Sequence, residues 1–214
     1  MARWAPARAD VIGEYADEVL QLFPSGRILV GIDGVDGAGK TTFARDLVAA
    51  LQERGVAAAA VSLEDFAARG QGQGGSRDAG AAAYDLDAFR RLVVAPYRRG
   101  EPVLPAHRTG DGEVPDPPAF QPGERAVLVV EGTFLHRKDL VGLWHASAWL
   151  QVPRAAARRR AADRDGVPVD DPRLEREAEA VERYFRELDP RKVANASFDL
   201  SDAAHPRRVF ADAC

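Results

Sequence analysis

Residues 27–42 read RILVGIDGVDGAGKTT, and this stretch decides the fold. Within it, residues 34–41 match the pattern G-x-x-x-x-G-K-[S/T] at every fixed position. An apolar run precedes the glycines and a helical pattern follows them, which is the context that such a motif needs. Glycines let successive backbone N–H groups turn toward one anion, and the next helix adds the positive end of its dipole. The stretch therefore predicts a phosphate-binding loop.

The residue types in this loop predict which ligands it binds. We expect the Lys40 ammonium to contact the β- and γ-phosphates of a nucleotide and to be catalytic. The Thr41 hydroxyl is a predicted ligand of Mg²⁺, which keeps few protein ligands and bridges phosphates. ATP and Mg²⁺ are therefore the expected cofactors. The expected nucleotide contacts are Gly34, Val35, Asp36, Gly37, Ala38, Gly39, Lys40, Thr41 and Thr42.

The rest of the chain has the pattern of a parallel α/β fold. Short apolar runs without polar alternation predict strands buried on both faces, and they alternate with amphipathic helices. We expect a three-layer P-loop NTPase fold with a five-stranded, mainly parallel sheet, helices on both faces and a small lid. The expected strands are residues 27–33, 56–63, 126–130, 146–152 and 197–200, and the expected helices are residues 7–23, 42–54, 86–99, 154–164 and 172–188.

Two segments stand apart from this pattern. Residues 69–83 are dense in Gly, Gln, Ser and Ala and predict a mobile loop, which leaves open whether they order when a substrate binds. Residues 102–121 hold five prolines and predict an extended excursion that is compatible with short β pieces. No linker divides the chain, so we expect a single domain over residues 1–214, with the lid at about residues 154–170.

Composition excludes several other classes. The formal net charge of the 214 residues is −4, with the two signs interspersed, so nucleic acid is not an expected partner. No apolar run reaches the roughly 20 residues that span a bilayer. Cys214 is the single cysteine, which excludes a disulfide framework and favours a cytoplasmic location. The expected partner is a small molecule with a hydroxyl group, while homo-oligomerisation stays open.

Acidic residues follow two of the predicted strands. Glu64 and Asp65 come after residues 56–63, and Glu131 comes after residues 126–130. Ligands of parallel sheets bind beyond the carboxyl ends of strands. Glu64 or Asp65 is therefore a candidate catalytic base that accepts a proton from a substrate hydroxyl. Glu131 resembles a Walker B acid and is a predicted magnesium residue. The ordinary alternative is an acidic helix N-cap for Glu64 and Asp65, and a solvated strand end for Glu131.

A basic helix follows the fourth predicted strand. Arg160 and Arg164 are four residues apart and share a face of that helix. Arginines on a closing lid stabilise the charge of a transferred phosphoryl group, so both are predicted to be catalytic. The alternative is a charged face that only meets solvent. The four histidines of the chain show no spacing typical of a metal site.

Taken together, these segments resemble the uridine kinase-like group of P-loop kinases, which includes phosphoribulokinase and bacterial pantothenate kinase. The matching segments are residues 31–42, 62–66, 84–87, 130–132 and 160–165. The resemblance covers roughly residues 27–200 and implies a five-stranded parallel sheet. It also implies ATP, Mg²⁺ and transfer of the γ-phosphate to a hydroxyl of a small molecule, first of all a nucleoside such as uridine or cytidine.

One departure from that family concerns the catalytic base. The family places Asp two residues before a Phe, whereas this chain has Glu64 there, with Asp65 beside it. Because Glu is one methylene longer, the sequence leaves the base open between the two.

Other functions stay open beside this one. Another small alcohol, pantothenate-like or sugar-like, is an alternative acceptor, and a nucleotide-binding regulator or NTPase without small-molecule transfer is a second class. The chain has no Asn-Lys-x-Asp motif, which disfavours a GTPase. Residues 36–42 also look like thymidylate kinase, but the Asp-Arg-Tyr/His motif of that family is missing, and residues 130–132 take its place.

Overall fold

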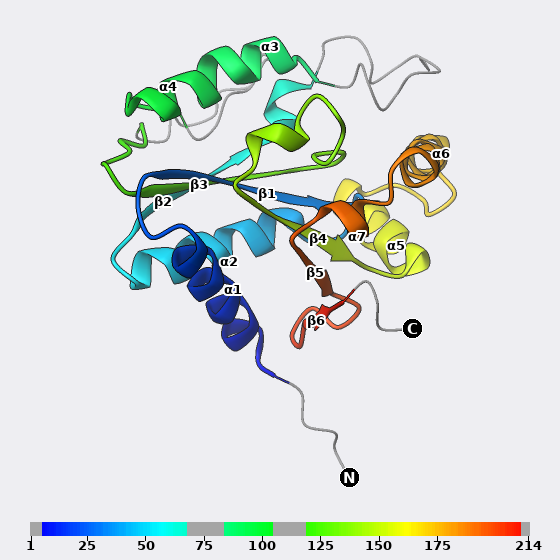
Figure 1. The fold of residues 1–214 in the computed structure, drawn as a ribbon. Helices are drawn as coiled ribbons and strands as arrows, with labels where there is room; N and C mark the ends of the chain where they lie inside the picture. Colours follow the sequence, from blue (N-terminus) through cyan, green and yellow to red (C-terminus); the bar gives the residue numbers. More distant parts are fainter. Residues whose placement is uncertain (1–5, 68–83, 105–118, 211–214) are drawn as a thin grey trace.

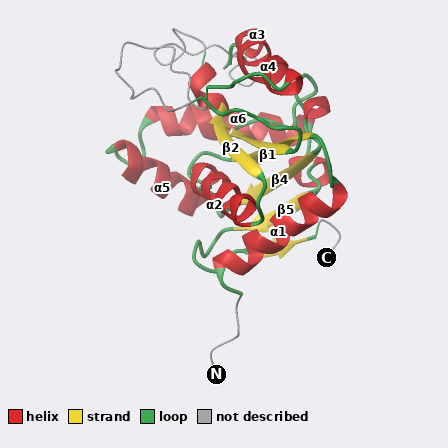
Figure 2. Cartoon of the chain, turned by 90° about the vertical axis from the view of Figure 1, so that its left-hand side faces the viewer, coloured by secondary structure: helices red, strands yellow, loops and turns green. Residues whose placement is uncertain are grey.

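A computed structural model describes residues 6–67, 84–104 and 119–210 of the chain. Six strands form one sheet in the order β2-β3-β1-β4-β5-β6, and the helices lie on both of its faces (Figures 1 and 2). The strands are β1 (Arg27–Gly34), β2 (Ala57–Ser62), β3 (Ala126–Gly132), β4 (Ala146–Gln151), β5 (Ala196–Asp199) and β6 (Arg207–Val209).

The five parallel strands expected from the sequence are all present. β1 pairs in parallel with β3 and β4, while β2 and β5 extend the sheet outward in the same direction. The count of five is wrong by one, because β6 pairs antiparallel with β5. β6 has only three residues, and two of them, Arg207 and Arg208, are charged. A segment this short carries no apolar run, so only its pairing with β5 defines it as a strand.

The helices form two layers around the sheet and a third group beyond its end. α1 and α2 pack on one face in a large apolar cluster, and the α3–α4 region packs on the other. α5 and α6 lie side by side and share a small apolar cluster around Leu174. The helices are α1 (Arg8–Leu22), α2 (Lys40–Glu53), α3 (Leu86–Phe89), α4 (Ala95–Arg99), α5 (Arg154–Asp165), α6 (Pro172–Glu187) and α7 (Pro190–Val193).

The helix expected over residues 86–99 contains a wider turn in its middle. α3 continues into the π-helical turn η2 (Arg90–Val94) and then into α4. Pro96 lies at the start of α4, has no N–H group and would crowd the carbonyl four residues earlier in a regular α-helix. A π turn just before Pro96 relieves that conflict without ending the helix.

The strand order brings the segments of interest to one edge of the sheet. In the parallel register, Ile32 of β1 lies beside Glu131 of β3, and Asp33 lies beside Trp149 of β4. The ends of β2 and β3 are matched as well, since Ser62 pairs with Glu131. The phosphate loop after β1, the acids after β2 and Glu131 therefore emerge together.

Some expectations fall on parts of the chain that the structure does not describe. The mobile loop predicted over residues 69–83 lies outside the described residues, as does most of the excursion over residues 102–121. At the two ends of that excursion, Val103 and Phe120 form an antiparallel bridge, with N···O distances of 2.9 and 2.7 Å. Among the described residues, no helix has the length and apolar character to cross a bilayer.

Candidate functional site

The phosphate loop has the backbone that its glycines require. Gly37 and Gly39 have φ values of 73° and 90°, in the left-handed region that favours glycine. Gly39 is the N-cap of α2, so the helix begins at Lys40 directly after the loop. The Lys40 side chain is buried, and its Nζ donates to the carbonyl of Val35 at 3.2 Å. The ammonium group is therefore folded back over the loop.

The backbone amides of this loop remain available to a ligand. Ala38 N–H is used in a turn to Val35 O, and Gly34 N–H is used by the Asp33 side chain. Within the described chain, no acceptor pairs with the amides of residues 36, 37 and 39–41. A loop of unpaired N–H groups at a helix N-terminus is an anion site. The residues therefore fit the phosphates of a nucleotide.

α5 lies directly against the loop at Gly37. A Cβ built on Gly37 would come within 2.1 Å of the carbonyl oxygen of Ala157, which belongs to α5. No side chain fits there without moving the helix backbone. By contrast, a Cβ on Gly39 would meet its nearest atom, Cδ2 of Leu200, at 3.8 Å. Gly37 is thus required by close packing as well as by its backbone conformation.

Thr41 and Glu131 meet, as the sequence predicts for a magnesium site. Thr41 Oγ1 donates to Glu131 Oε1 at 3.2 Å. Burial raises the pKa of the Glu131 carboxyl, while the Ser62 hydroxyl, the Lys40 charge and Thr41 act in the opposite direction. A hydroxyl and a carboxylate oxygen are hard ligands of the kind that Mg²⁺ prefers. The chemistry of this donor pair fits a magnesium ion that also contacts phosphates.

Glu64 faces this pair from the end of β2. It lies in the 3₁₀ turn η1 (Leu63–Phe66), and its Oε1 accepts a hydrogen bond from Tyr84 Oη at 2.7 Å. Thr133 Oγ1, just after β3, approaches the same oxygen at 3.5 Å. Burial, and then the charge of Glu64, raises the pKa of the Tyr84 hydroxyl, so Tyr84 remains a proton donor to the carboxylate. Glu64 is exposed and held in place, whereas Asp65 beside it is half-buried.

The two predicted lid arginines have different surroundings. Arg164 Nη1 and Nη2 donate to the two carboxylate oxygens of Asp36 in the phosphate loop, at 2.7 and 3.0 Å. Arg160 instead donates through Nη2 to the carbonyls of Leu200 and Ser201, both at 3.2 Å. The structure therefore brings Arg164 to the loop and holds Arg160 against the segment after β5.

Glu177 of α6 also lies near this site, although no sequence pattern indicated it. Solvent reaches the side chain, yet burial among the surrounding protein groups raises the pKa of the Glu177 carboxyl to about 7. The charge of Asp36 acts next in the same direction, and the Arg164 charge opposes it. On an exposed helix, Glu177 looks like any other surface acid of α6. Only the position of α6 next to the loop distinguishes it.

We expect Glu177→Gln to stabilise the protein at high pH. The pKa of Glu177 is raised from 4.5 to about 7 on folding, so ionisation opposes folding increasingly as pH rises through this window and fully above it. Below about pH 4.5 both states bind the proton and the variant should equal the wild type. Because solvent screens this group, the increase in Tm will be small. Thermal unfolding at pH 5 and pH 8 measures it.

Glu179→Gln, at an exposed acid on the same helix, is the matched control for that measurement. Any general effect of removing one charge from α6 will appear in both variants. An equal change in Tm for the two variants at pH 8 would contradict the effect assigned to the surroundings of Glu177.

Sequence patterns also miss a buried polar group directly before the loop. Asp33, the last residue before Gly34, is fully buried and accepts hydrogen bonds from the backbone of Phe134 and from the side chains of His136 and Tyr184. The network could have been inferred from one signal only, a carboxylate inside an otherwise apolar strand, because a buried charge requires partners. Phe134 itself has a φ of 69°, unusual for a residue with a large side chain.

The strand order, the loop and the helix after it define the fold of a P-loop kinase. No protein-family model matches the chain, and no curated protein matches it in sequence. Solved structures do match it over most of its length, and several of them are described as kinases of small molecules. The resemblance inferred from the sequence is thereby confirmed at the level of the fold.

Three of these structures illustrate the range. A protein from Bacillus stearothermophilus described as a "Possible Uridine Kinase" has a TM-score of 0.64 at 19% identity, over 89% of this chain and 98% of that one. A candidate fructose transport system kinase from Silicibacter sp. TM1040 has 0.56 at 25%, over 81% and 87%. D-glycerate 3-kinase from Cryptococcus neoformans var. grubii has 0.54 at 12%, over 93% and 99%.

Proposed function

We propose that this protein is an ATP-dependent small-molecule kinase that transfers the γ-phosphate to a hydroxyl group. The observation that carries the proposal is the phosphate loop with unpaired amides and a buried Lys40, opposite an exposed carboxylate at the end of β2. A loop alone supports nucleotide binding. The carboxylate of Glu64, held at the same edge of the sheet, adds a proton acceptor for the attacking hydroxyl.

Different residues of the chain would bind the nucleotide phosphates and the magnesium ion. The loop amides and Lys40 hold the phosphates of ATP, and residues 34–42 form the nucleotide contact. Thr41 and Glu131 would hold Mg²⁺, which when bound neutralises charge on the phosphates. Arg164 reaches the loop through Asp36, and its guanidinium, which also pairs with Asp165, lies beside the loop. Arg160 remains a proposed lid residue, beside the segment that follows β5.

Glu64 is the residue that we assign as the base. Its carboxylate accepts the hydroxyl proton of the acceptor as the hydroxyl oxygen forms its bond to the γ-phosphorus. The bond from the γ-phosphorus to the bridging oxygen breaks, and ADP leaves with that electron pair. Tyr84 and Thr133 orient the carboxylate. Asp65, one residue further along η1, is the alternative, and the longer side chain of Glu64 supports our order.

The acceptor class that the described residues support best is a neutral alcohol. The carboxylate of Glu64 on the acceptor side repels a second negative charge, which favours a nucleoside such as uridine or cytidine, or a sugar, over a pantothenate-like acid. The names of the similar structures, which mention uridine, fructose and glycerate, support a hydroxyl-bearing metabolite in general. We place nucleosides first and sugars second.

The test is a panel of hydroxyl metabolites with MgATP and coupled detection of ADP. The panel should include uridine, cytidine, several sugars, pantothenate and glycerate. We expect at least one neutral member to raise ADP formation well above the rate without acceptor. Turnover that no acceptor changes would favour an NTPase or regulator instead, and no turnover with any member would refute the kinase proposal.

Glu64→Gln and Asp65→Asn should differ sharply in kcat. We expect Glu64→Gln to lower kcat about 100-fold, since removal of a general base costs roughly two to four orders of magnitude. Gln keeps the length of Glu and can still pair with Tyr84, so binding of MgATP should change little. Asp65→Asn should leave kcat within about threefold of the wild type, within the usual range for a residue that does not react. Steady-state kinetics with the best acceptor measure both.

The pair of variants serves as its own control, because the two acids are neighbours in one turn. A loss confined to Asp65→Asn would move the base to Asp65. Equal and mild losses in both variants would mean that neither residue accepts the proton.

A further inference from the structure

A buried polar network lies directly behind the phosphate loop and centres on Asp33. Its Oδ1 accepts from the backbone N–H groups of Gly34 and Phe134, at 2.8 and 3.0 Å. Its Oδ2 accepts from Tyr184 Oη at 2.7 Å and from the backbone N–H of His136 at 3.2 Å, and it contacts His136 Nδ1 at 2.8 Å. One carboxylate therefore joins the start of the loop, the segment after β3 and α6.

The network continues to β4 in an order that resembles a hydrolytic triad. His136 Nε2 lies 3.0 Å from Ser147 Oγ, and Ser147 in turn contacts Asn195 Oδ1 through its N–H at 2.9 Å. Asp33, His136 and Ser147 thus follow the sequence of contacts found in Ser-His-Asp enzymes. All three are buried, with exposed fractions of 0, 1 and 4%, so no substrate reaches the serine. The arrangement can orient groups but cannot act on a substrate.

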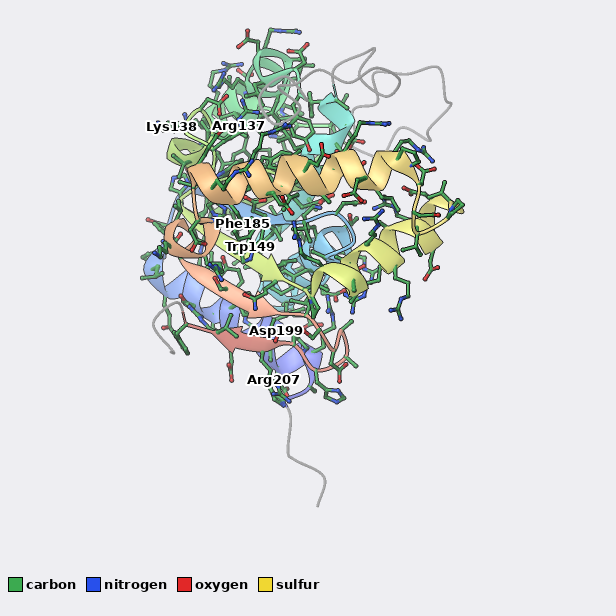
Figure 3. The ribbon with its side chains drawn as sticks, turned by 90° about the vertical axis from the view of Figure 1, so that its right-hand side faces the viewer. Arg137, Lys138, Trp149, Phe185, Asp199 and Arg207 are labelled. Atoms are coloured by element: carbon green, nitrogen blue, oxygen red, sulfur yellow. The ribbon has the colours of Figure 1, made fainter. Side chains whose placement is uncertain are left out.

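Tyr184 is the point where α6 joins this network. Its hydroxyl donates to Asp33 and also accepts from the backbone N–H of His136 at 3.1 Å. The ring is buried against Phe134, with ring centroids 5.0 Å apart. The same helix makes a second aromatic contact, between Phe185 and Trp149 of β4, with ring centroids 5.2 Å apart; both residues are labelled in Figure 3. The aromatic contacts bury apolar surface, whereas the directional hydrogen bond of the Tyr184 hydroxyl fixes the orientation of the side chain.

Ion pairs connect α6 to α5, and a further ion pair connects α5 to the phosphate loop. Arg158 of α5 pairs with Glu175 of α6 at 2.6 Å, and Arg154 pairs with Glu182. At the C-terminal end of α5, Arg164 forms an ion pair with Asp36 of the phosphate loop. A closed circuit thus runs from the loop to Asp33, α6, α5 and back to the loop. Two side-chain contacts of this circuit reach the loop region, Tyr184–Asp33 and Arg164–Asp36, beside the close backbone approach of α5 at Gly37.

We propose that Tyr184 and His136 are positioning residues of the phosphoryl-transfer site, which act through Asp33 to set where α5 and α6 lie over the phosphate loop. This inference rests on the proposed kinase function. Both side chains are buried, so we assign them no direct contact with the nucleotide or the acceptor. Their effect is to keep Arg164 and the start of the loop in one arrangement, because a buried, fully satisfied hydrogen-bond network admits few alternatives.

Tyr184→Phe isolates the proposed role, since it removes one oxygen and keeps the ring. We expect kcat for ADP formation from MgATP, with the best acceptor of the panel, to fall about 10-fold at 20 °C. The Kd of the Mg²⁺ complex of the non-hydrolysable analogue AMPPNP should change less than threefold, because the loop amides and Lys40 remain. A purely structural role would lower Tm but leave kcat unchanged well below it.

Tyr97→Phe is the matched control. Tyr97 is also buried, and its hydroxyl oxygen lies 2.9 and 2.8 Å from the carbonyl oxygens of Ile28 and Ala126, at the opposite end of the sheet. We expect this variant to lose stability while its kcat stays at the wild-type value. If Tyr184→Phe behaves like Tyr97→Phe, the positioning role is refuted while the kinase proposal stands.

A double-mutant cycle between Tyr184→Phe and Arg164→Gln tests the circuit itself. The two side chains make no contact in the described structure, so independent roles predict multiplicative losses in kcat. We expect the double variant to lose little more than Arg164→Gln alone, because both changes disturb one arrangement. Multiplicative losses would overturn the inference.

Variants of His136 test which of its two ring nitrogens matters for kcat. Asn mimics Nδ1 of histidine and Gln mimics Nε2, so His136→Asn should retain more kcat than His136→Gln if the contact with Asp33 is the one that matters. The opposite order would overturn the role of His136. A wild-type chain that neither binds MgAMPPNP nor turns over MgATP would refute the kinase proposal and this inference together.

Discussion

Lys40→Ala should lower the turnover of MgATP by about 1000-fold, which corresponds to roughly 4 kcal/mol of lost transition-state stabilisation. Lys40 is the one lysine in the loop; it begins α2, and its buried ammonium donates to the carbonyl of Val35, directly after β1. In such a partly dehydrated site, a positive charge acts more strongly on developing negative charge than it does in water. Coupled ADP detection with the best acceptor measures the loss in kcat/KM.

Lys192→Ala is the control for that experiment. Lys192 is exposed on the short helix α7, and we expect its removal to change kcat/KM less than twofold, as for most surface changes. Circular dichroism should show both variants folded. Lys40→Ala with near wild-type turnover would mean that the phosphate site is elsewhere, and the proposed function would fall with it.

Asp33→Asn should lower the free energy of unfolding by about 3–4 kcal/mol. The carboxylate accepts from five donors in the interior, three of them at Oδ2. An amide keeps one acceptor oxygen and turns an NH₂ group toward the remaining donors, and each buried donor left unpaired costs about 1–3 kcal/mol. Urea denaturation followed by tryptophan fluorescence measures this difference.

Asp46→Asn provides the comparison at the surface. Asp46 pairs with Arg8 at 2.7 Å, and both side chains keep part of their exposure. Loss of such a pair costs about 1 kcal/mol or less. If the two asparagine variants lose the same stability, the hydrogen bonds to Asp33 contribute no more than a surface ion pair, and the network has been misjudged.

The parts of the site that lie close together in the sequence were predictable. Residues 34–41 form their loop because the glycines, the preceding strand and the following helix are consecutive, so local geometry suffices. The pairing of Thr41 with Glu131 was also predictable, although 90 residues separate them. Thr41 follows the loop at the carboxyl end of β1, and Glu131 lies at the carboxyl end of β3, the parallel neighbour of β1. The carboxyl ends of neighbouring parallel strands meet at one edge of the sheet.

The choice between Glu64 and Asp65 was not available from the sequence. Both acids follow the same strand, and a spacing argument cannot tell which way each side chain leaves a 3₁₀ turn. The folded chain brings Tyr84 and Thr133 to Glu64 from two other segments, which gives that carboxylate a fixed orientation. Similarly, Arg160 and Arg164 share a helix face, yet their partners, Leu200 and Asp36, come from different parts of the chain.

By itself the sequence determined the parallel α/β fold, the phosphate loop and the residues that border it, because apolar periodicity, glycine placement and strand-end acids are local signals. Only the tertiary structure decided how the loop is supported. Asp33 and Tyr184 are 151 residues apart, and no periodicity links them. Their contact exists because a carboxylate enclosed in an apolar strand must be matched by donors from whatever segments pack around it, and that packing is a property of the whole fold.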